Sequence, residues 1–290
     1  MSGTIGPLFC LDRARSSREP AASFRSHIPE PLVMADLDLP RISADLERIL
    51  RLRNPPFGMK LYENAKDMEA IQRIRRPKNV HTLDQVVGQA ARLGWTVGVT
   101  SENLVGAQCR AVVGLGNAKT PEWATGKPTV GVWHGDAQSA AARQAALNCV
   151  PDGRYEALVV SPLAAGRLDP PDIALFYATP GAMMYFINGM QYVGYKKFDW
   201  GVVGETACAD SWGRALSKRE PSLSIPCFAE RRYGGVLDDE MLMAIPPEQL
   251  DKVIKGMESL AKNGLRYPFP QYGIQLDVRE GMQRSYPGRS

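Results

Sequence analysis

Two cysteines, Cys208 and Cys227, lie in the part of the chain with the densest set of chemically active side chains, GETACADSWGRALSKREPSLSIPCFAERRYGGVLDDE. Pro226 directly precedes Cys227, where it restrains the backbone and removes one hydrogen-bond donor. The two cysteines are 19 positions apart, which is too wide for a local Cys-x-x-Cys clip. A shared metal ion or cluster therefore needs a third donor that the fold brings from elsewhere. Cys109, in ENLVGAQCRAVVGLG, is the best candidate for that donor.

The complete cysteine set indicates a reducing compartment. A chain of 290 residues can bury a sizeable core without disulfides. An odd number of cysteines without regular spacing is typical of proteins that keep their thiols reduced, and we expect a cytoplasmic protein. The polar neighbours of Cys208 and Cys227 indicate that these two lie outside the core, whereas Cys149 ends an alanine-rich helix and fits an inert, buried residue. The five are Cys10, Cys109, Cys149, Cys208 and Cys227.

Three dispersed cysteines are typical ligands of a cubane iron–sulfur cluster. Cys109, Cys208 and Cys227 can each bind one iron of a [4Fe-4S] cluster, which leaves the fourth iron open to a substrate hydroxyl or carboxylate. Zinc is the alternative metal, because it also binds thiolates. A histidine-rich metal site is not indicated, since the chain has only three histidines and they are far apart in the sequence.

Charged residues around these cysteines supply candidates for catalysis. Glu205 lies three positions before Cys208 and is the favoured acid/base, while Arg231 and Arg232 can clamp a substrate anion by forked hydrogen bonds. Asp239 is a second candidate acid/base, together with its neighbours Asp238 and Glu240. The same acidic triplet could instead cap the next segment or pair with the arginines.

Other function classes lack their usual sequence signals. The segment GLGNAK lacks the spacing of a phosphate-binding loop, and no Gly-x-Ser-x-Gly or His-Glu-x-x-His motif is present. The net charge is only +4, and the basic run RIRRPK has no interleaved aromatic residues, so no nucleic-acid partner is expected. No run of 18 apolar residues indicates a membrane span. We expect a small-molecule substrate and a homo-oligomer.

The pattern of apolar residues predicts an α/β fold, with a mixed sheet and flanking helices. Helices are predicted from Ser43, from Thr82 to Gly94, from Asp136 to Leu147, from Pro180 and from Pro246 to Gly264. Strands are predicted at Gly58–Tyr62, Thr96–Thr100, Tyr155–Val160 and Asp172–Tyr177, and the first two flank a helix as in a βαβ-type unit. Residues 41–268 are expected to form one domain, between an N-terminal extension (1–40) and a C-terminal tail (269–290).

Several segments carry a resemblance to a known family. They are TLDQVVGQAARLGWTVGVTSENL, YEALVVSPL followed by PDIALFYATPGAMMYFINGMQY, and ETACADSWGRALSKREPSLSIPCFAERRYGG. With these segments the chain resembles the uncharacterised DUF169 family, also called the ArCR family, from Arg41 to Gly264. Members often carry a cysteine before the glutamine of the early helix, where this chain has Asp84, and another after the next strand, where Cys109 lies a few residues late.

Together these observations lead to one leading hypothesis and two alternatives. The leading one is an enzyme that uses the open iron of a [4Fe-4S] cluster as a Lewis acid, in a non-redox lyase or hydratase reaction or group removal on a small aromatic or carboxylated compound. The first alternative is a redox- or ligand-sensing iron–sulfur or thiol protein without turnover. The second is a cysteine-nucleophile enzyme, which lacks a local histidine to activate the thiol.

Overall fold

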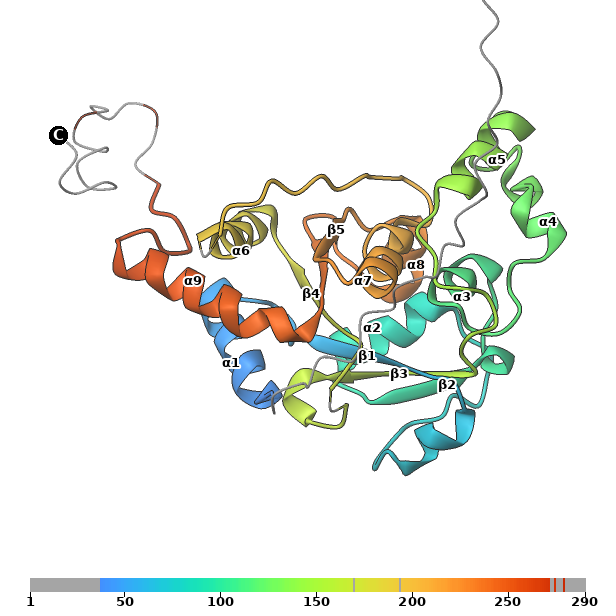
Figure 1. Cartoon of the computed structure of the whole chain (residues 1–290), viewed down its shortest axis with the longest axis horizontal. Coiled ribbons are helices and arrows are strands. Elements are labelled where there is room, and N and C mark those ends of the chain that lie inside the picture. The colour runs from blue at the N-terminus through green and yellow to red at the C-terminus, as the bar shows by residue number, and fades with distance from the viewer. Residues whose placement is uncertain (1–36, 169, 193, 272–273, 275–278, 280–290) are drawn as a thin grey trace, which may run out of the picture. The chain divides into compact units, whose positions relative to one another are not determined.

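The structure of this protein is a computed structural model that describes residues 37–168, 170–192, 194–271, 274 and 279. These residues form one sheet of six strands with helices on both faces, which confirms the predicted α/β class (Figure 1). The extension predicted for residues 1–40 and the tail predicted for 269–290 fall almost entirely outside the described residues.

Neighbouring strands of the sheet pair antiparallel throughout, which differs from the predicted mixed sheet. Because β3 lies between β1 and β2 and runs opposite to both, β1 and β2 point in the same direction. The predicted βαβ-type unit is therefore present, with a third strand inserted between its two strands. In sheet order the strands are β2 (Val97–Thr100), β3 (Ala157–Pro162), β1 (Phe57–Tyr62), β4 (Ile173–Ala178), β6 (Met241–Ile245) and β5 (Ser222–Ser224).

Nine α-helices and six short 3₁₀ helices lie in the described residues. The α-helices are α1 (Leu39–Leu50), α2 (Leu83–Leu93), α3 (Ala107–Val113), α4 (Pro121–Ala124), α5 (Ala137–Ala146), α6 (Pro180–Tyr192), α7 (Trp212–Lys218), α8 (Phe228–Gly234) and α9 (Leu250–Lys262). The 3₁₀ helices are η1 (Ala65–Ala70), η2 (Ser101–Asn103), η3 (Lys127–Thr129), η4 (Leu163–Ala165), η5 (Ala207–Ala209) and η6 (Pro247–Gln249).

Local signals explain where the helices begin. Helix α1 starts four residues before the predicted Ser43, because the Asp38 carboxylate accepts a hydrogen bond from the Arg41 backbone N–H at 3.0 Å and Pro40 suits the first turn. At α2, the Thr82 hydroxyl accepts from the Gln85 N–H while the Gln85 side chain accepts from the Thr82 N–H, which is a capping box. This confirms the predicted start of α2.

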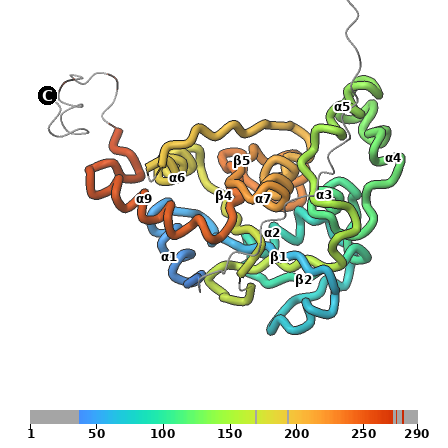
Figure 2. Tube along the Cα trace, in the orientation of Figure 1, coloured from blue at the N-terminus to red at the C-terminus, as the bar shows by residue number. Residues whose placement is uncertain are grey.

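Alternate residues of the strands enter separate apolar clusters on the two faces of the sheet, two of them large and a third small one around Met68. On β4, Leu175 and Tyr177 face the cluster formed with α2, α3 and α7, whereas Phe176 and Ala178 face α1, α6 and α9. Helices α6 and α9 cross closely, since a Cβ atom on Gly256 would lie 2.2 Å from the Gly189 carbonyl oxygen. Helices α1 and α9 also lie side by side although they come from distant parts of the chain (Figures 1 and 2).

The second of these clusters, with α1, α6 and α9, accounts for the methionine-rich α6. Met183, Tyr185 and Phe186 are buried there, so the helix belongs to the core as its composition predicts. No helix among the described residues combines the length and apolar character needed to cross a membrane. The first cluster, with α2, α3 and α7, contains Cys208 and packs against Cys109, and it therefore carries the candidate site.

Candidate functional site

Cys109, Cys208 and Cys227 approach one another on the α2 side of the sheet. Cys109 lies on α3, Cys208 on η5, and Cys227 directly before α8. The Cys208 thiol donates to Cys109 Sγ, with 3.6 Å between the two sulfur atoms. Cys227 is near enough for its charge to raise the pKa of the Cys208 thiol. The structure thus brings together three cysteines separated by up to 118 positions in the sequence.

Burial of these cysteines differs from the prediction. Cys208 is fully buried in the apolar cluster with Trp212, and Cys227 is 7% exposed. The prediction that both lie outside the core is wrong, because η5 turns the chain inward. Asp210 lies two residues after Cys208, and its carboxylate accepts a hydrogen bond from the Val203 N–H at 2.8 Å. This polar neighbour of Cys208 is therefore buried with a hydrogen-bond partner. The cysteine site is therefore enclosed, and nearby groups strongly affect its charges.

Asp84 faces the cysteines from the first turn of α2. Its carboxylate oxygens lie 3.8 and 4.0 Å from Cys109 Sγ, and the residue is only 3% exposed. The capping box at Thr82 fixes the helical turn that carries this carboxylate. A buried aspartate beside a thiol is unusual, because a carboxylate without a cation is costly to remove from water.

Glu230 supplies a second buried carboxylate on the opposite helix, α8. One of its oxygens accepts from the Cys227 N–H at 2.8 Å, and the other, Oε1, is buried without a hydrogen-bond partner. Helices α2 and α8 touch through glycines, since a Cβ atom on Gly88 would lie 2.5 Å from the Gly234 carbonyl oxygen. This close approach places the first turns of both helices beside the same site.

Arg143 of α5 provides the positive charge near the cysteines. Its guanidinium forms an ion pair with Glu205 and hydrogen bonds with the Thr206 hydroxyl and the Glu205 carbonyl. Thr206 has φ 58°, a left-handed conformation that is strained for a β-branched residue. The contacts with Arg143 offset that strain and fix the loop that leads to Cys208. Glu205 is thereby positioned as the partner of Arg143.

Burial keeps the thiols protonated when no metal is bound. The pKa of Cys208 is raised well above its ordinary value by its hydrogen bond to Cys109 and by burial. Burial and the Glu230 charge raise the pKa of Cys227 to about 12. For Cys109, the hydrogen bond from Cys208 lowers the pKa, but burial and the charges of Asp84 and Glu230 outweigh it. Such thiols are poor nucleophiles, which disfavours the cysteine-nucleophile alternative.

The pKa values of the two buried carboxyl groups are raised as well. Burial raises the pKa of Asp84 to about 6 and that of Glu230 to about 7. The charge of Arg231 lowers the pKa of Glu230 but does not outweigh burial. The site therefore holds an excess of acidic groups, and a bound cation is the usual means of stabilising their ionised forms.

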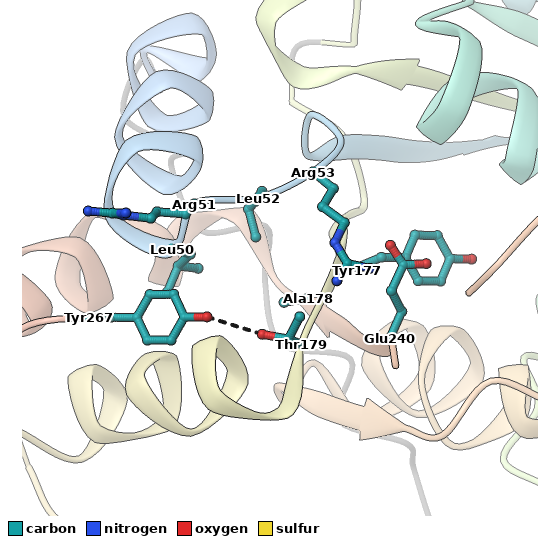
Figure 3. A pocket seen from close by; sticks show the side chains of 9 residues that line it. All are labelled: Leu50, Arg51, Leu52, Arg53, Tyr177, Ala178, Thr179, Glu240 and Tyr267. Atoms are coloured by element: carbon teal, nitrogen blue, oxygen red, sulfur yellow. Dashed lines mark hydrogen bonds between the residues drawn. The ribbon is translucent and has the colours of Figure 1, made fainter. Parts of the chain in front are cut away.

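A second polar group adjoins the site at the end of β4. Arg92 forms an ion pair with the buried Glu240 and lies over the Tyr177 ring, 4.9 Å from its centroid. Burial raises the pKa of Tyr177 well above its ordinary value, and the charges of Glu230 and Asp84 add to this. Tyr177 and Glu240 also line a small surface cleft with Arg53 (Figure 3). Tyr177 therefore lines that cleft and also lies close enough to Asp84 and Glu230 for their charges to raise its pKa.

The remaining predicted residues are directed elsewhere. Asp239 is exposed and accepts from Arg53 at 2.7 Å, while Arg232 is exposed on α8. Arg231 donates to the carbonyls of Pro226 and Leu237, so it closes the loop around α8. Cys149 is half-buried, and Cys10 lies outside the described residues.

Sequence reasoning missed three groups at the site: Asp84 as a neighbour of Cys109, the buried Glu230, and Arg143. A signal existed for Glu230, since Cys227-x-x-Glu230 has the spacing of an N-terminal capping pair. Nothing in the alanine-rich segment around Arg143 indicates a charge directed at cysteines. Asp84 was noted only as a departure from a family pattern.

The donor set fits a metal that prefers sulfur. Two thiolates bound about 2.3 Å from one tetrahedral ion lie about 3.8 Å apart, close to the 3.6 Å between Cys109 and Cys208. Among the described residues, no three His, Cys, Asp or Glu side chains already converge at ligand distance. Binding therefore requires a rotation of at least one side chain, such as that of Cys227.

Comparisons with known proteins give a family but no assigned activity. The model of the DUF169 family, described as uncharacterised ArCR, matches residues 45–256. An uncharacterized protein of Methanocaldococcus jannaschii is 25% identical over 89 residues, which are 30% of this chain and 38% of that protein, so the match spans well under half of the relative. No solved structure matches the chain. Since the family model spans most of the 290 residues, and the whole sheet and cysteine site lie within its match, the chain belongs to the DUF169 family.

Proposed function

We propose that this protein is an enzyme whose thiolate-bound metal centre, held by Cys109, Cys208 and Cys227, acts as a Lewis acid. The observation that carries this proposal is the 3.6 Å separation of Cys109 Sγ and Cys208 Sγ inside a buried site with two further acidic groups. The ionised forms of these buried side chains, which a metal requires as ligands, are costly without a cation. A bound metal ion would stabilise the thiolates and offset that cost.

Two forms of the centre are compatible with these ligands. In the [4Fe-4S] form each cysteine binds a different iron, so Cys109 Sγ and Cys208 Sγ must move apart from their present 3.6 Å. In the single-ion form, with zinc as the alternative metal, the two sulfur atoms share one ion at nearly their present separation. Either centre would polarise an oxygen of a substrate.

The proposed reaction is a non-redox elimination, hydration or group removal on a small aromatic or carboxylated compound. Two half-exposed rings, Trp133 and Phe228, are in contact beside Cys227, with centroids 5.8 Å apart, and they support an aromatic substrate. Glu205 would transfer the proton, and Arg231, Arg232 and Asp239 are the further candidates for binding and proton transfer. Of these, Arg231 must first leave the Pro226 and Leu237 carbonyls, and Asp239 must leave Arg53. For this role Glu205 must loosen its ion pair with Arg143.

Metal and sulfide analysis of anaerobically purified protein tests the proposal. Cys208→Ser and Cys227→Ser should lose the bound metal, whereas the matched control Cys149→Ser should retain it. Iron with an equal amount of sulfide identifies the cluster form, and zinc without sulfide identifies the single-ion form. Wild-type protein without stoichiometric iron or zinc, or Cys208→Ser protein with full metal content, would contradict the proposal.

Proton transfer is tested separately with Glu205→Gln. This change keeps the shape of the side chain and should lower turnover by about 10²- to 10⁴-fold while metal content stays unchanged. Because Glu205 also anchors Arg143, the melting temperature of the same variant must be measured. Full turnover in a folded Glu205→Gln protein would remove this residue from the catalytic group.

A second candidate function is thiol-based redox sensing without turnover. The same 3.6 Å contact favours it, because Cys109 and Cys208 need only a small approach to form a disulfide. In that reaction a peroxide would accept two electrons from the two thiols and become water and an alcohol, or two waters from hydrogen peroxide. Mass spectrometry of peroxide-treated protein should then find a peptide pair joined through Cys109 and Cys208. Unchanged thiols after treatment would rule out this candidate.

A further inference from the structure

Asp84 is buried beside a cysteine thiol, an environment that is typical of a metal ligand and unfavourable for a carboxylate without a cation. Its two oxygens lie 3.8 and 4.0 Å from Cys109 Sγ, and only 3% of the residue is exposed. Arg92 and Arg143, two arginines described beside the site, form their ion pairs with Glu240 and Glu205 rather than with Asp84. By comparison, the buried Glu240 has Arg92 as a partner.

The distances around Asp84 match the edges of one coordination tetrahedron. An ion about 2.3 Å from a thiolate and about 2.1 Å from a carboxylate oxygen places those two donors about 3.6 Å apart. The shorter of the two distances from Asp84 to Cys109 is 3.8 Å, and the Cys109–Cys208 distance is 3.6 Å. One divalent ion can therefore bind Cys109 together with either Asp84 or Cys208 at nearly the present separations. Binding all three at once requires a side-chain rotation, because no three such side chains converge among the described residues.

Charge balance supports the same arrangement. Three thiolates and one carboxylate carry four negative charges, of which a divalent ion neutralises two. Arg143 supplies a further positive charge close to all four cysteines of the described chain. The ionised site is therefore partly compensated before any substrate binds.

We propose that Asp84 is a direct oxygen ligand, so that the chain holds one thiophilic divalent ion with three thiolates and one carboxylate. The inference rests on the proposed metal centre and adds to it both the fourth ligand and the single-ion form. Asp84 binds the same ion as Cys109 and Cys208, and Cys227 completes the set after its side chain turns toward them. For the ion to act as a Lewis acid, a substrate oxygen then displaces the Asp84 carboxylate or adds as a fifth ligand.

Cobalt(II) is a suitable probe, because thiolate ligands give it intense near-ultraviolet absorption and a tetrahedral site gives it strong visible bands. The full-length metal-free protein is titrated with Co²⁺ under anaerobic conditions. We expect Asp84→Asn to weaken Co²⁺ binding by on the order of 10-fold or more. Asp84→Cys should retain tight binding and increase the thiolate absorption by about one third, since four thiolates replace three.

The matched control is Asp172→Asn. Asp172 is also a largely buried carboxylate with a raised pKa, but it accepts from the Leu61 N–H on the sheet. This variant should bind Co²⁺ as the wild type does. Circular dichroism of each variant shows whether it is folded, and Asp84→Cys provides the test if Asp84→Asn does not fold.

The outcomes separate this inference from the proposed function. Wild-type protein that shows no thiolate absorption with Co²⁺ would overturn the metal centre and the inference together. Wild-type protein with the thiolate signal, but with unchanged affinity in Asp84→Asn and an unchanged spectrum in Asp84→Cys, would overturn the inference alone. In that case the three cysteines would remain as ligands without Asp84.

Discussion

At the scale of single residues, burial decides how the acidic groups of the site are charged. Glu230 is 1% exposed, and its pKa rises from 4.5 to about 7, mainly because of burial. The folded state therefore holds this proton more firmly than the unfolded state does. As pH rises from about 4.5 to about 7, the unfolded chain releases the proton first, so the free energy of unfolding must fall over that interval.

Glu230→Gln should remove this part of the pH dependence, because glutamine cannot ionise. The metal-free wild type should lose about 3 kcal/mol of stability between pH 4.5 and pH 7.5 through this group, and the variant should lose correspondingly less. Urea unfolding of both proteins at the two pH values measures the difference. An identical pH dependence in wild type and variant would show that Glu230 is not held protonated in the folded protein.

At the scale of elements, the contact between α2 and α8 positions both buried carboxylates. Gly88 permits this contact, since a Cβ atom there would lie 2.5 Å from the Gly234 carbonyl oxygen and 2.9 Å from its Cα. Both neighbours are backbone atoms, which cannot rotate away. The separation of the two helices therefore depends on the absence of a side chain at this position.

Gly88→Ala should push α8 away from α2, cost about 1–3 kcal/mol and weaken metal binding. Gly135→Ala is the matched control, because a Cβ atom on Gly135 meets nothing within 4 Å. Chemical unfolding and a metal titration of both variants measure the two effects. If Gly88→Ala binds metal with wild-type affinity, the helix contact does not set the geometry of the site.

The sequence predicts these elements better than their contacts. Thr82 and the apolar period of the following residues predict α2 closely, because capping and amphipathicity are local. The contact of Gly88 with Gly234 joins positions 146 residues apart, and no local pattern reveals it. For the same reason the spacing of Cys227 and Glu230 indicates a helix cap but not the burial of Glu230, which depends on the packing of α8.

The strands themselves were also easier to predict from the sequence than their order in the sheet. The strands β1 to β4 were predicted from apolar runs, since each is almost entirely buried. The insertion of β3 between β1 and β2 was not predicted, because strand order depends on pairing between distant segments. The burial of Cys208 also depends on tertiary packing, through the 3₁₀ turn that carries it into the core.

At the scale of the whole molecule, one sheet separates the two large apolar clusters. The metal centre is proposed on the face with α2, α3 and α7, while α1, α6 and α9 cover the other face. The two faces share strands, so they contribute to one folding unit. We nevertheless expect that a substitution in the cluster with α1, α6 and α9 leaves the geometry of the cysteine site on the other face unchanged.

Leu46→Ala tests this separation. Leu46 is fully buried on α1, so its truncation should cost about 2–5 kcal/mol and lower the melting temperature. The folded fraction should still bind the same amount of metal per chain, because no residue of the cysteine site contributes to the cluster around Leu46. Metal content below the folded fraction measured by circular dichroism would show that the α1 face also controls the site.

X-ray absorption at the K-edge of the bound metal reports the atoms that surround the metal, so it shows whether cysteine sulfur binds it. We expect sulfur scatterers about 2.3 Å from the metal, and fewer of them in Cys208→Ser protein. A lighter oxygen scatterer near 2.0–2.2 Å, lost in Asp84→Asn, would accompany them if Asp84 is a ligand. A shell of oxygen and nitrogen alone, without sulfur, would contradict a metal centre built on Cys109, Cys208 and Cys227.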